Sequence, residues 1–285
     1  MIKTLNEYFK IARLNRKAIG HFNFCTSDQL RAIVDASVEL GVPVMVATSE
    51  GEADFIGRRQ AVALVKSYRF AGLPVFLNAD HHKSFESIQA CIQAGYDTVL
   101  FDGSKLSFEK NITETRRVVE YAKSVNPDMQ VEGELGYLRG SSEIQSKVEI
   151  SKDDYTKPEE ARKFIEQTGV ERLAVVFGNI HGIVTEQEER LDIDLLKDII
   201  GIVGDTHIVL HGASGLKDRD VADAIKIGVA NVHINTELRV AYHDALAKYF
   251  SVNVNETTPY KYLKMSYEEM RKVVLQKLKL FQGDI

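Results

Sequence analysis

The hydrophobic residues of the chain form short continuous runs that alternate with longer segments of mixed polarity. Runs such as 42–47 and 173–177 are apolar at nearly every position, which is typical of strands buried on both faces of a parallel sheet. The segments between the runs place apolar residues three and four positions apart, which indicates amphipathic helices. The pattern therefore predicts repeated units of a strand followed by a helix along nearly the whole chain.

Eight such units are expected, followed by one extra C-terminal helix at 267–281 that packs on the barrel or on a second subunit. Eight units in about 250 residues favour a single closed (β/α)8 TIM barrel of the α/β class, with a doubly wound open sheet as the alternative. The whole chain, 1–285, is predicted to be one domain. The polar stretch 137–156 shows no strong pattern and is expected to form an irregular active-site lid. The predicted strands are 18–24, 42–47, 74–79, 98–102, 130–134, 173–178, 207–210 and 231–235, and the helices that follow them begin near residue 27 and cover 58–69, 85–94, 109–123, 158–168, 194–202, 218–227 and 237–250.

Composition and charge narrow the class of protein. The 36 basic and 41 acidic side chains give a net charge of −5, and the basic residues are scattered, so nucleic acid is not an expected partner. Apolar runs fall far short of the ~20 residues that span a bilayer, and residues 1–20 lack the hydrophobic stretch of a signal peptide. Cys25 and Cys91 stand alone, which suits a reducing compartment. We therefore expect a cytoplasmic protein that does not associate with membranes.

Polar residues gather where the predicted strands end, and the carboxyl ends of barrel strands are where catalytic residues meet. His81, His181 and His211 follow three different strands, which suits a Zn²⁺ ion held by three imidazoles with an open fourth position. The alternative is that each histidine only hydrogen-bonds its own loop. Glu134 is a possible fourth ligand or a group that orients a neighbour. Asp80, next to His81, is suited to proton transfer or to supporting a histidine.

A second kind of site is predicted after the last two strands. Gly212 and Ser214 lie in the turn His-Gly-Ala-Ser-Gly, and Asn235 and Thr236 begin the next helix. Small residues and a helix N-terminus let backbone N–H groups approach an anion, and barrels commonly bind phosphate in these two loops. An ordinary turn is the alternative for the glycine-rich segment.

Together these segments resemble the class II, metal-dependent ketose-bisphosphate aldolase family over almost the full chain. The family's fold is a (β/α)8 barrel, and its reaction cleaves a ketose phosphate such as fructose 1,6-bisphosphate into dihydroxyacetone phosphate and an aldehyde. The segments that carry the resemblance are 21–23 (His-Phe-Asn), 48–51 (Thr-Ser-Glu-Gly), 79–81 (Ala-Asp-His), 101–104 (Phe-Asp-Gly-Ser) with 108–112 (Phe-Glu-Lys-Asn-Ile), 132–136 (Glu-Gly-Glu-Leu-Gly), 178–182 (Gly-Asn-Ile-His-Gly), 210–215 (Leu-His-Gly-Ala-Ser-Gly) and 235–237 (Asn-Thr-Glu).

The resemblance implies roles for individual residues. Zn²⁺ would be held by the three histidines, polarising the ketose carbonyl and stabilising the enediolate left when the C3–C4 bond breaks, and a monovalent cation is also allowed. Asp80 would transfer the proton at the C4 oxygen, and Glu143, on the loop after the fifth strand, is the candidate second acid or base. Family members are generally dimers or larger. The implied contacts to substrate and phosphate are Asn23, Ser49, Gly182, Gly212, Ser214, His233, Asn235, Thr236 and, for a distal phosphate, Arg239.

Three departures from the family pattern bear on the substrate. His82 replaces a usual glycine and is expected to bring a bulky ring near the metal. Thr185 stands where a phosphate-neutralising lysine is frequent, and His233 replaces an asparagine, with Asn235 where aspartate is frequent. A changed substrate, such as tagatose bisphosphate or a sugar-acid phosphate, would explain them, and so would a non-catalytic phosphosugar-binding barrel.

Two other enzyme classes fit the sequence less well. A Schiff-base aldolase needs a buried lysine, and none lies within the last four predicted strands. Many metal-dependent hydrolase barrels need a His-x-His pair on the first strand, which here reads His21-Phe22-Asn23.

Overall fold

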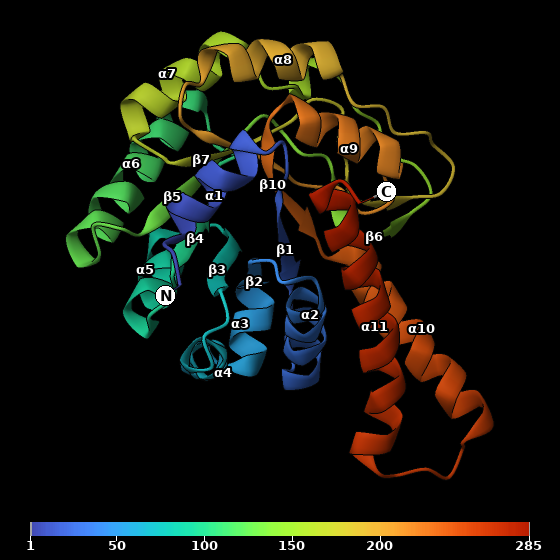
Figure 1. Ribbon diagram of the computed structural model, residues 1–285. Helices are drawn as coiled ribbons and strands as arrows, with labels where there is room; N and C mark the ends of the chain where they lie inside the picture. Colours follow the sequence, from blue (N-terminus) through green and yellow to red (C-terminus); the bar gives the residue numbers. More distant parts are fainter. Residues whose placement is uncertain (1, 285) are drawn as a thin grey trace.

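The structure, a computed structural model, describes residues 2–284. Within this part of the chain, eight parallel strands close into a barrel, and the last strand pairs with the first. This arrangement confirms the predicted (β/α)8 barrel and excludes the open sheet (Figure 1). The predicted domain, 1–285, extends one residue beyond the described part at each end. In barrel order the strands are β1 (Ile19–Asn23), β2 (Val44–Thr48), β3 (Val75–His82), β4 (Thr98–Phe101), β5 (Gln130–Leu135), β7 (Arg172–Val175), β9 (His207–Leu210) and β10 (Val229–Ile234).

Helices surround the barrel and bury the outward-facing side chains of the strands (Figure 1). Several end at a glycine in the left-handed region, such as Gly41, Gly95 and Gly169, where a residue without a Cβ closes the last turn at little cost. The helices that follow the barrel strands are α2 (Ser27–Leu40), α4 (Arg58–Phe70), α5 (Phe85–Ala94), α6 (Phe108–Val125), α7 (Pro158–Thr168), α8 (Ile193–Ile202), α9 (Asp218–Ile227) and α10 (Thr236–Val252).

Two α-helices of the described chain were not predicted. Helix α1 (Leu5–Leu14) lies across the amino end of the barrel, where Phe9 packs with Ile19, Met45 and Phe76 at the beginnings of three strands. Helix α3 (Glu50–Ile56) follows β2 directly and begins with a capping box between Ser49 and Glu52. The first helix closes the bottom of the barrel, and the second forms part of the wall at its mouth.

The C-terminal helix α11 (Pro259–Gln282) is longer than predicted. It packs against α2 and touches β1, which confirms the predicted contact with the barrel. Its first half lies beside α10, and the two helices project together from the barrel as an arm (Figure 1).

The stretch 137–156 was expected to be irregular, and this prediction was wrong. It contains the strand β6 (Gly140–Gln145) and the short helix η1 (Lys152–Asp154). Strand β6 pairs in parallel with β8 (His181–Val184), which follows β7, so the two form a separate sheet beside the barrel mouth. No helix within residues 2–284 is long and apolar enough to cross a membrane.

Candidate active site

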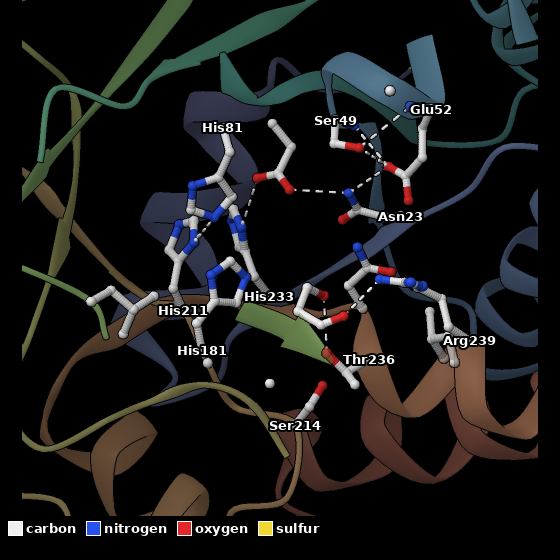
Figure 2. A pocket seen from close by; sticks show the side chains of 18 of the residues that line it. Asn23, Ser49, Glu52, His81, His181, His211, Ser214, His233, Thr236 and Arg239 are labelled. Atoms are coloured by element: carbon white, nitrogen blue, oxygen red, sulfur yellow. Dashed lines mark hydrogen bonds and ion pairs between the residues drawn. The ribbon is translucent and has the colours of Figure 1, made fainter. Parts of the chain in front are cut away.

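A pocket of about 730 Å³ opens at the carboxyl ends of the barrel strands (Figure 2). Of the residues predicted for the site, Glu143 alone lies outside the pocket lining in the described part of the chain. The predicted residues that line it are Asn23, Ser49, Asp80, His81, Glu134, His181, Gly182, His211, Gly212, Ser214, His233, Asn235, Thr236 and Arg239.

An irregular end of β3 directs His81 into the pocket. His81 has φ +51°, a conformation that residues with a Cβ rarely adopt, and the pairing of β3 with β4 shifts register between Ala79 and His82. Such strain is found where a functional side chain must be re-aimed. The prediction that His82 brings its ring near the metal was wrong, because its Nδ1 lies 2.6 Å from the Ser87 hydroxyl on α5, behind the strand.

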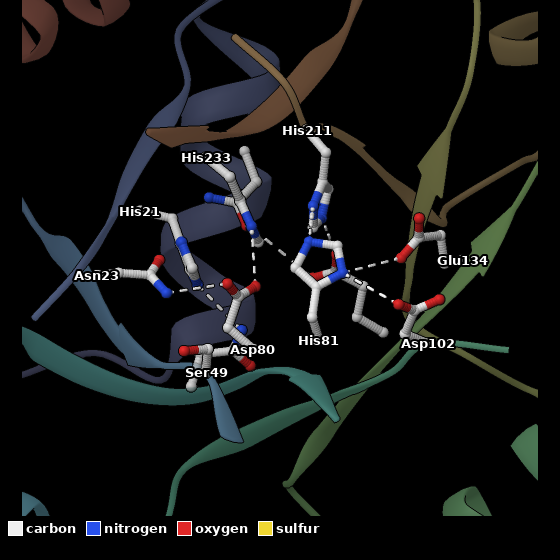
Figure 3. Close-up of polar contacts among 12 residues, drawn as sticks. His21, Asn23, Ser49, Asp80, His81, Asp102, Glu134, His211 and His233 are labelled. Carbon is white, nitrogen blue, oxygen red and sulfur yellow. Dashed lines mark hydrogen bonds and ion pairs between the residues drawn. The ribbon is translucent and has the colours of Figure 1, made fainter. Parts of the chain in front are cut away.

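Two histidine nitrogens lie next to each other in the pocket. His81 Nε2 lies 2.9 Å from His211 Nδ1, and the opposite nitrogen of each ring faces a carboxylate (Figure 3). His81 Nδ1 is 3.3 Å from Glu134 and 3.4 Å from Asp102, while His211 Nε2 is 2.8 Å from Glu132. When each ring carries a single proton, held toward its carboxylate, both facing nitrogens keep a lone pair. This is the arrangement by which carboxylates orient metal-binding histidines.

The carboxylates around His81 favour positive charge at this place, either a proton on the ring or a metal ion beside it. Burial alone lowers the pKa of His81, but the carboxylates of Asp80 and Glu134 outweigh it and hold that pKa well above its usual range. Burial and the neighbouring imidazoles lower the pKa of His181 to about 3, so its ring is neutral, and it stacks on His81 with centroids 5.1 Å apart. A neutral imidazole is the form that binds Zn²⁺. Asp80, His81 and His211 bring possible ligand atoms within 4.8 Å of one another, and His181 stacks on His81. This group therefore fits a bound metal ion once His81 gives up its extra proton. Glu134 contacts His81 on the side away from His211.

Asp80 is held as a carboxylate beside this group. Its Oδ2 accepts a hydrogen bond from Asn23 Nδ2 at 3.0 Å, and its Oδ1 lies 3.4 Å from His233 Nδ1. Burial alone raises the pKa of Asp80, but the charge on His81 and the contact with His233 hold it well below the usual range. Asp80 can therefore accept a proton from a group bound in the pocket.

His233, which contacts Asp80 directly, belongs to a stacked pair of histidines. Its ring lies flat on His21, with centroids 3.4 Å apart and an interplanar angle of 4° (Figure 3). Burial holds the pKa of both rings well below the usual range, so both are neutral. The Nε2 of His233 is 3.1 Å from Asn231 Oδ1, which fixes the ring that faces Asp80.

A buried ion pair lies beneath the histidines, and sequence reasoning missed its cationic member. Arg172, on β7, has no exposed surface, and its Nη1 lies 2.5 Å from Glu132 Oε2. Its guanidinium also donates to the side chains of Asn78, Thr98 and Asn231 from other strands. Glu132 is thereby held against both Arg172 and the pocket histidine His211.

The predicted phosphate loops come together on one side of the pocket. Gly182 and Gly212 have φ of +99° and +64°, which glycine adopts without strain. Ser214 and Thr236 face the same space, and Figure 2 shows both on the side opposite Ser49. The Oδ1 of Asn235, at the beginning of α10, is buried without a hydrogen-bond partner in the described chain. The Ser214 and Thr236 hydroxyls, the backbone N–H groups of the loops and the N-terminus of α10 can bind an anion, whereas the Asn235 oxygen can accept a hydrogen bond from a hydroxyl.

The predicted lid, residues 137–156, pairs with β8 through its strand β6 and sits beside these loops. Arg139 donates two hydrogen bonds to Asp154, at 2.9 and 2.8 Å, which ties the two ends of the lid together. Arg239 donates to the backbone oxygen of Ser142 at 2.7 Å, so α10 contacts the lid directly. Glu143, the predicted second acid or base, is exposed on β6.

Several further pocket residues were not predicted. Glu52 accepts hydrogen bonds from Asn23 and from the Ser49 backbone and hydroxyl, and Lys83 and Lys105 lie exposed at the rim. The Ser-x-x-Glu spacing of a capping box directly after a strand is the sequence signal that could have located Glu52. Thr185, where a lysine is frequent in the family, contacts Gln145 of the lid.

The fold and this set of side chains define a (β/α)8-barrel enzyme whose pocket at the strand ends is lined by histidines and carboxylates. Residues 3–284 match the family described as fructose-bisphosphate aldolase class-II. The chain is 35% identical over 277 residues to the D-tagatose-1,6-bisphosphate aldolase subunit GatY of Klebsiella oxytoca, covering 96% of this chain and 95% of that protein. It belongs to the class II fructose-bisphosphate aldolase family and is an aldolase-type lyase.

Solved structures agree with this assignment. The YdjI aldolase of Escherichia coli K12 is similar with a TM-score of 0.83 and 28% identity, covering 99% of this chain and 97% of that one. The fructose-bisphosphate aldolase of Campylobacter jejuni is similar with a TM-score of 0.82 and 21% identity, covering 98% and 94%, which supports the fold.

Proposed function

We propose that the protein reversibly cleaves a ketose phosphate into dihydroxyacetone phosphate and an aldehyde, as one aldolase domain with a resident metal ion. The observation that carries the proposal is the pair of facing nitrogens on His81 and His211, each backed by a carboxylate, with Asp80 beside them. A simple binding barrel has no need of a carboxylate beside a metal-binding set, and the first strand lacks the His-x-His pair that many hydrolase barrels use.

His81, His181 and His211 would hold the ion, which we propose to be Zn²⁺. When bound, such an ion polarises a substrate carbonyl and lowers the cost of negative charge on the neighbouring carbons. Glu134 and Glu132 orient two of the ligands rather than joining them, because each faces the ring nitrogen away from the shared space. A monovalent cation near the same carboxylates is an additional proposal.

Asp80 moves the proton of the bond-breaking step. In cleavage the C4 hydroxyl gives its proton to Asp80, and its oxygen electrons form the aldehyde carbonyl. The electron pair of the C3–C4 bond stays on C3 as an enediolate, which takes up a proton to give dihydroxyacetone phosphate. We assign the second acid or base to Glu143, which the lid must turn toward the pocket to act.

The remaining predicted residues position the substrate. Gly182, Gly212, Ser214 and Thr236 bind the phosphate of dihydroxyacetone phosphate, because they line one side of the pocket next to the N-terminus of α10. Asn235, whose buried oxygen has no partner among the described residues, would accept a hydrogen bond from a substrate hydroxyl in the same region. The other contacts that we propose, toward the aldehyde half, are Asn23, Ser49, His233 and Arg239.

We also propose a cytoplasmic homo-oligomer. The unpaired cysteines support a reducing compartment. The arm of α10 and α11 supports assembly, because Phe250, Val252 and Val254 at its end are exposed. The related GatY protein is itself named as a subunit.

Cleavage of a panel of ketose phosphates, followed by release of dihydroxyacetone phosphate, tests the proposal. Removing the ion with a chelator should abolish cleavage, and added Zn²⁺ should restore it. Asp80→Asn should lower kcat by about 100-fold or more, because general acid–base groups contribute on that scale. Asp128→Asn, an exposed carboxylate before β5, is the control and should retain wild-type rates. Cleavage that survives complete removal of metal would disprove the proposal.

A further inference from the structure

One side of the pocket presents hydrogen-bond acceptors where a second phosphate would need donors. We call this side, formed by Asn23, Ser49, Glu52 and Asp80, the acceptor corner. Figure 2 shows Asn23, Ser49 and Glu52 grouped together, across the pocket from Ser214. The acceptor corner therefore faces the aldehyde half of a substrate whose phosphate lies at the other side.

The donors of this corner are already used within the protein. Glu52 Oε2 accepts from Asn23 Nδ2 at 2.9 Å, from the Ser49 backbone N–H at 2.7 Å and from the Ser49 hydroxyl at 2.9 Å. The same Asn23 nitrogen also donates to Asp80 Oδ2 at 3.0 Å. Both amide hydrogens of Asn23 and the hydroxyl hydrogen of Ser49 are thus directed at carboxylates and away from a ligand.

What the corner offers a ligand is oxygen. Glu52 Oε1 takes part in no hydrogen bond among the described residues. Asp80 Oδ1 is buried, and its near neighbour is His233 Nδ1 at 3.4 Å, beyond the length of a good hydrogen bond. Two carboxylates joined through one amide nitrogen repel an anion and attract hydroxyl groups. Burial raises the pKa of Glu52, and the hydrogen bonds that Ser49 and Asn23 donate to its carboxylate oppose this rise.

The lysine and arginine side chains near Glu52 do not cancel its charge. Lys83 and Lys105 are exposed at the rim, where solvent and salt screen them. Arg239 is also exposed, and its guanidinium donates to the lid at Ser142. A phosphate on a three-carbon aldehyde would therefore lie near the carboxylates of Glu52 and Asp80, without a lysine or arginine shielded from solvent to neutralise it.

We infer that Glu52 is a specificity-determining residue, and that the acceptor corner selects an uncharged, hydroxyl-bearing aldehyde over a phosphorylated one. The substrate is then a ketose 1-phosphate that carries its phosphate on the dihydroxyacetone phosphate half. This inference rests on the proposed function and names the substrate class of the same site.

Condensation of dihydroxyacetone phosphate with glyceraldehyde and with glyceraldehyde 3-phosphate tests the inference on the Zn²⁺-loaded protein. Wild type should have the higher kcat/KM with glyceraldehyde. Glu52→Gln removes the charge but keeps the spacing of the capping box. It should shift the kcat/KM ratio toward glyceraldehyde 3-phosphate by at least tenfold, and Glu52→Asp, which keeps the charge, should stay within about threefold of wild type.

Glu7→Gln is the matched control. Glu7 forms the same kind of capping box with Thr4 at the beginning of α1, at the other end of the barrel, so this variant loses the same charge in the same motif. Its ratio of kcat/KM values should equal that of wild type. Faster wild-type condensation with glyceraldehyde 3-phosphate, or an unchanged ratio in Glu52→Gln, overturns the inference.

Hydrogen exchange at C3 of dihydroxyacetone phosphate, followed by NMR in deuterated water, separates the two proposals because it needs no aldehyde. If wild type catalyses exchange but condenses faster with glyceraldehyde 3-phosphate than with glyceraldehyde, only the inference about Glu52 is refuted. Absence of exchange in the loaded wild-type protein refutes the proposed function and this inference with it. Exchange by Glu52→Gln also shows that this variant is folded.

Discussion

Arg172 is the least expected residue of the barrel interior, where branched apolar side chains are usual. It is fully buried and contacts Glu132, whose other oxygen faces His211. Burial raises the pKa of Glu132 on its own, but the guanidinium and His211 lower it below the usual range. The pair therefore sets the orientation of a proposed metal ligand from beneath.

Removing one member of this pair should be costly. Arg172→Met leaves the Glu132 carboxylate buried without its cation, so we expect a loss of about 3–5 kcal/mol in the free energy of unfolding. Arg172→Met/Glu132→Gln should recover most of that loss, because the uncompensated charge is gone. Urea unfolding measures both. Arg162→Met, which breaks an exposed pair with Glu159, should change stability by less than about 1 kcal/mol, and an equal effect at Arg172 would contradict the argument.

Residues at strand ends could be predicted from sequence, because a parallel barrel brings those ends together. His81, His181 and His211 meet for that reason. His82 could not be placed correctly, because the strained backbone at His81 re-aims the side chains at the end of β3. Arg172 could not be recognised either, since its partners lie on strands far away in the sequence.

At the scale of elements, the lid depends on close contact between β6 and β8. A Cβ on Gly182 would lie 2.2 Å from the backbone oxygen of Ser141 and 2.4 Å from that of Glu143. Both contacts are shorter than real Cβ atoms tolerate, and the backbone oxygens on β6 cannot turn aside. Glycine at this position therefore allows the two strands to pair.

Gly182→Ala should separate the lid from β8. We expect faster proteolytic cleavage within 137–156 and at least a tenfold lower kcat/KM, because the same glycine lines the proposed phosphate loop. Gly41→Ala is the control, since Gly41 also has a positive φ, of +65°, but has open space around it. It should lose about 1–2 kcal/mol of stability from backbone strain and leave lid cleavage unchanged. Equal proteolysis of the two variants would count against the lid.

The barrel elements were predictable because their strands are buried on both faces and read as apolar runs. Strand β6 reads as polar because it is exposed, and its only partner in the described chain is β8, about 40 residues away. Helix α1 begins before the first strand and so falls outside the repeating unit on which the prediction was based.

At the scale of the whole molecule, the free energy of unfolding should depend on pH because of His207, which is buried at the amino end of the barrel. His207 is 3% exposed, stacks on Phe9 of α1 with centroids 5.0 Å apart, and contacts Asn6 at 3.1 Å. Burial, and then the charges of Arg13 and Arg172, lower the pKa of His207 to about 4. The neutral form of His207 is therefore the one that packs against α1.

The direction of the pH effect follows from this shift. The unfolded chain binds a proton at His207 below about pH 6.5, and the folded protein does so only near pH 4, so the full contribution is present above pH 6.5 and is lost as the pH falls toward 4. Between pH 7 and pH 5 the loss should be about 2 kcal/mol. Urea unfolding at pH 7 and pH 5 measures the fall in the free energy of unfolding. This fall should be smaller by about 2 kcal/mol in His207→Phe than in wild type. Any metal release at pH 5 affects both proteins equally and cancels in the comparison. His243→Phe, at an exposed site, should keep the wild-type difference.

The closure of the barrel also determines when the molecule can be completed during synthesis. Strand β1 leaves the ribosome first, yet one of its two neighbours, β10, begins at Val229. The backbone N–H of Ala18, just before β1, donates to the oxygen of Phe281 near the end of α11. A nascent chain that stops before Val229 has two free strand edges, which are templates for pairing with other chains. During translation the sheet therefore stays open until β10 has been made, and the contact between Ala18 and α11 is the last to form.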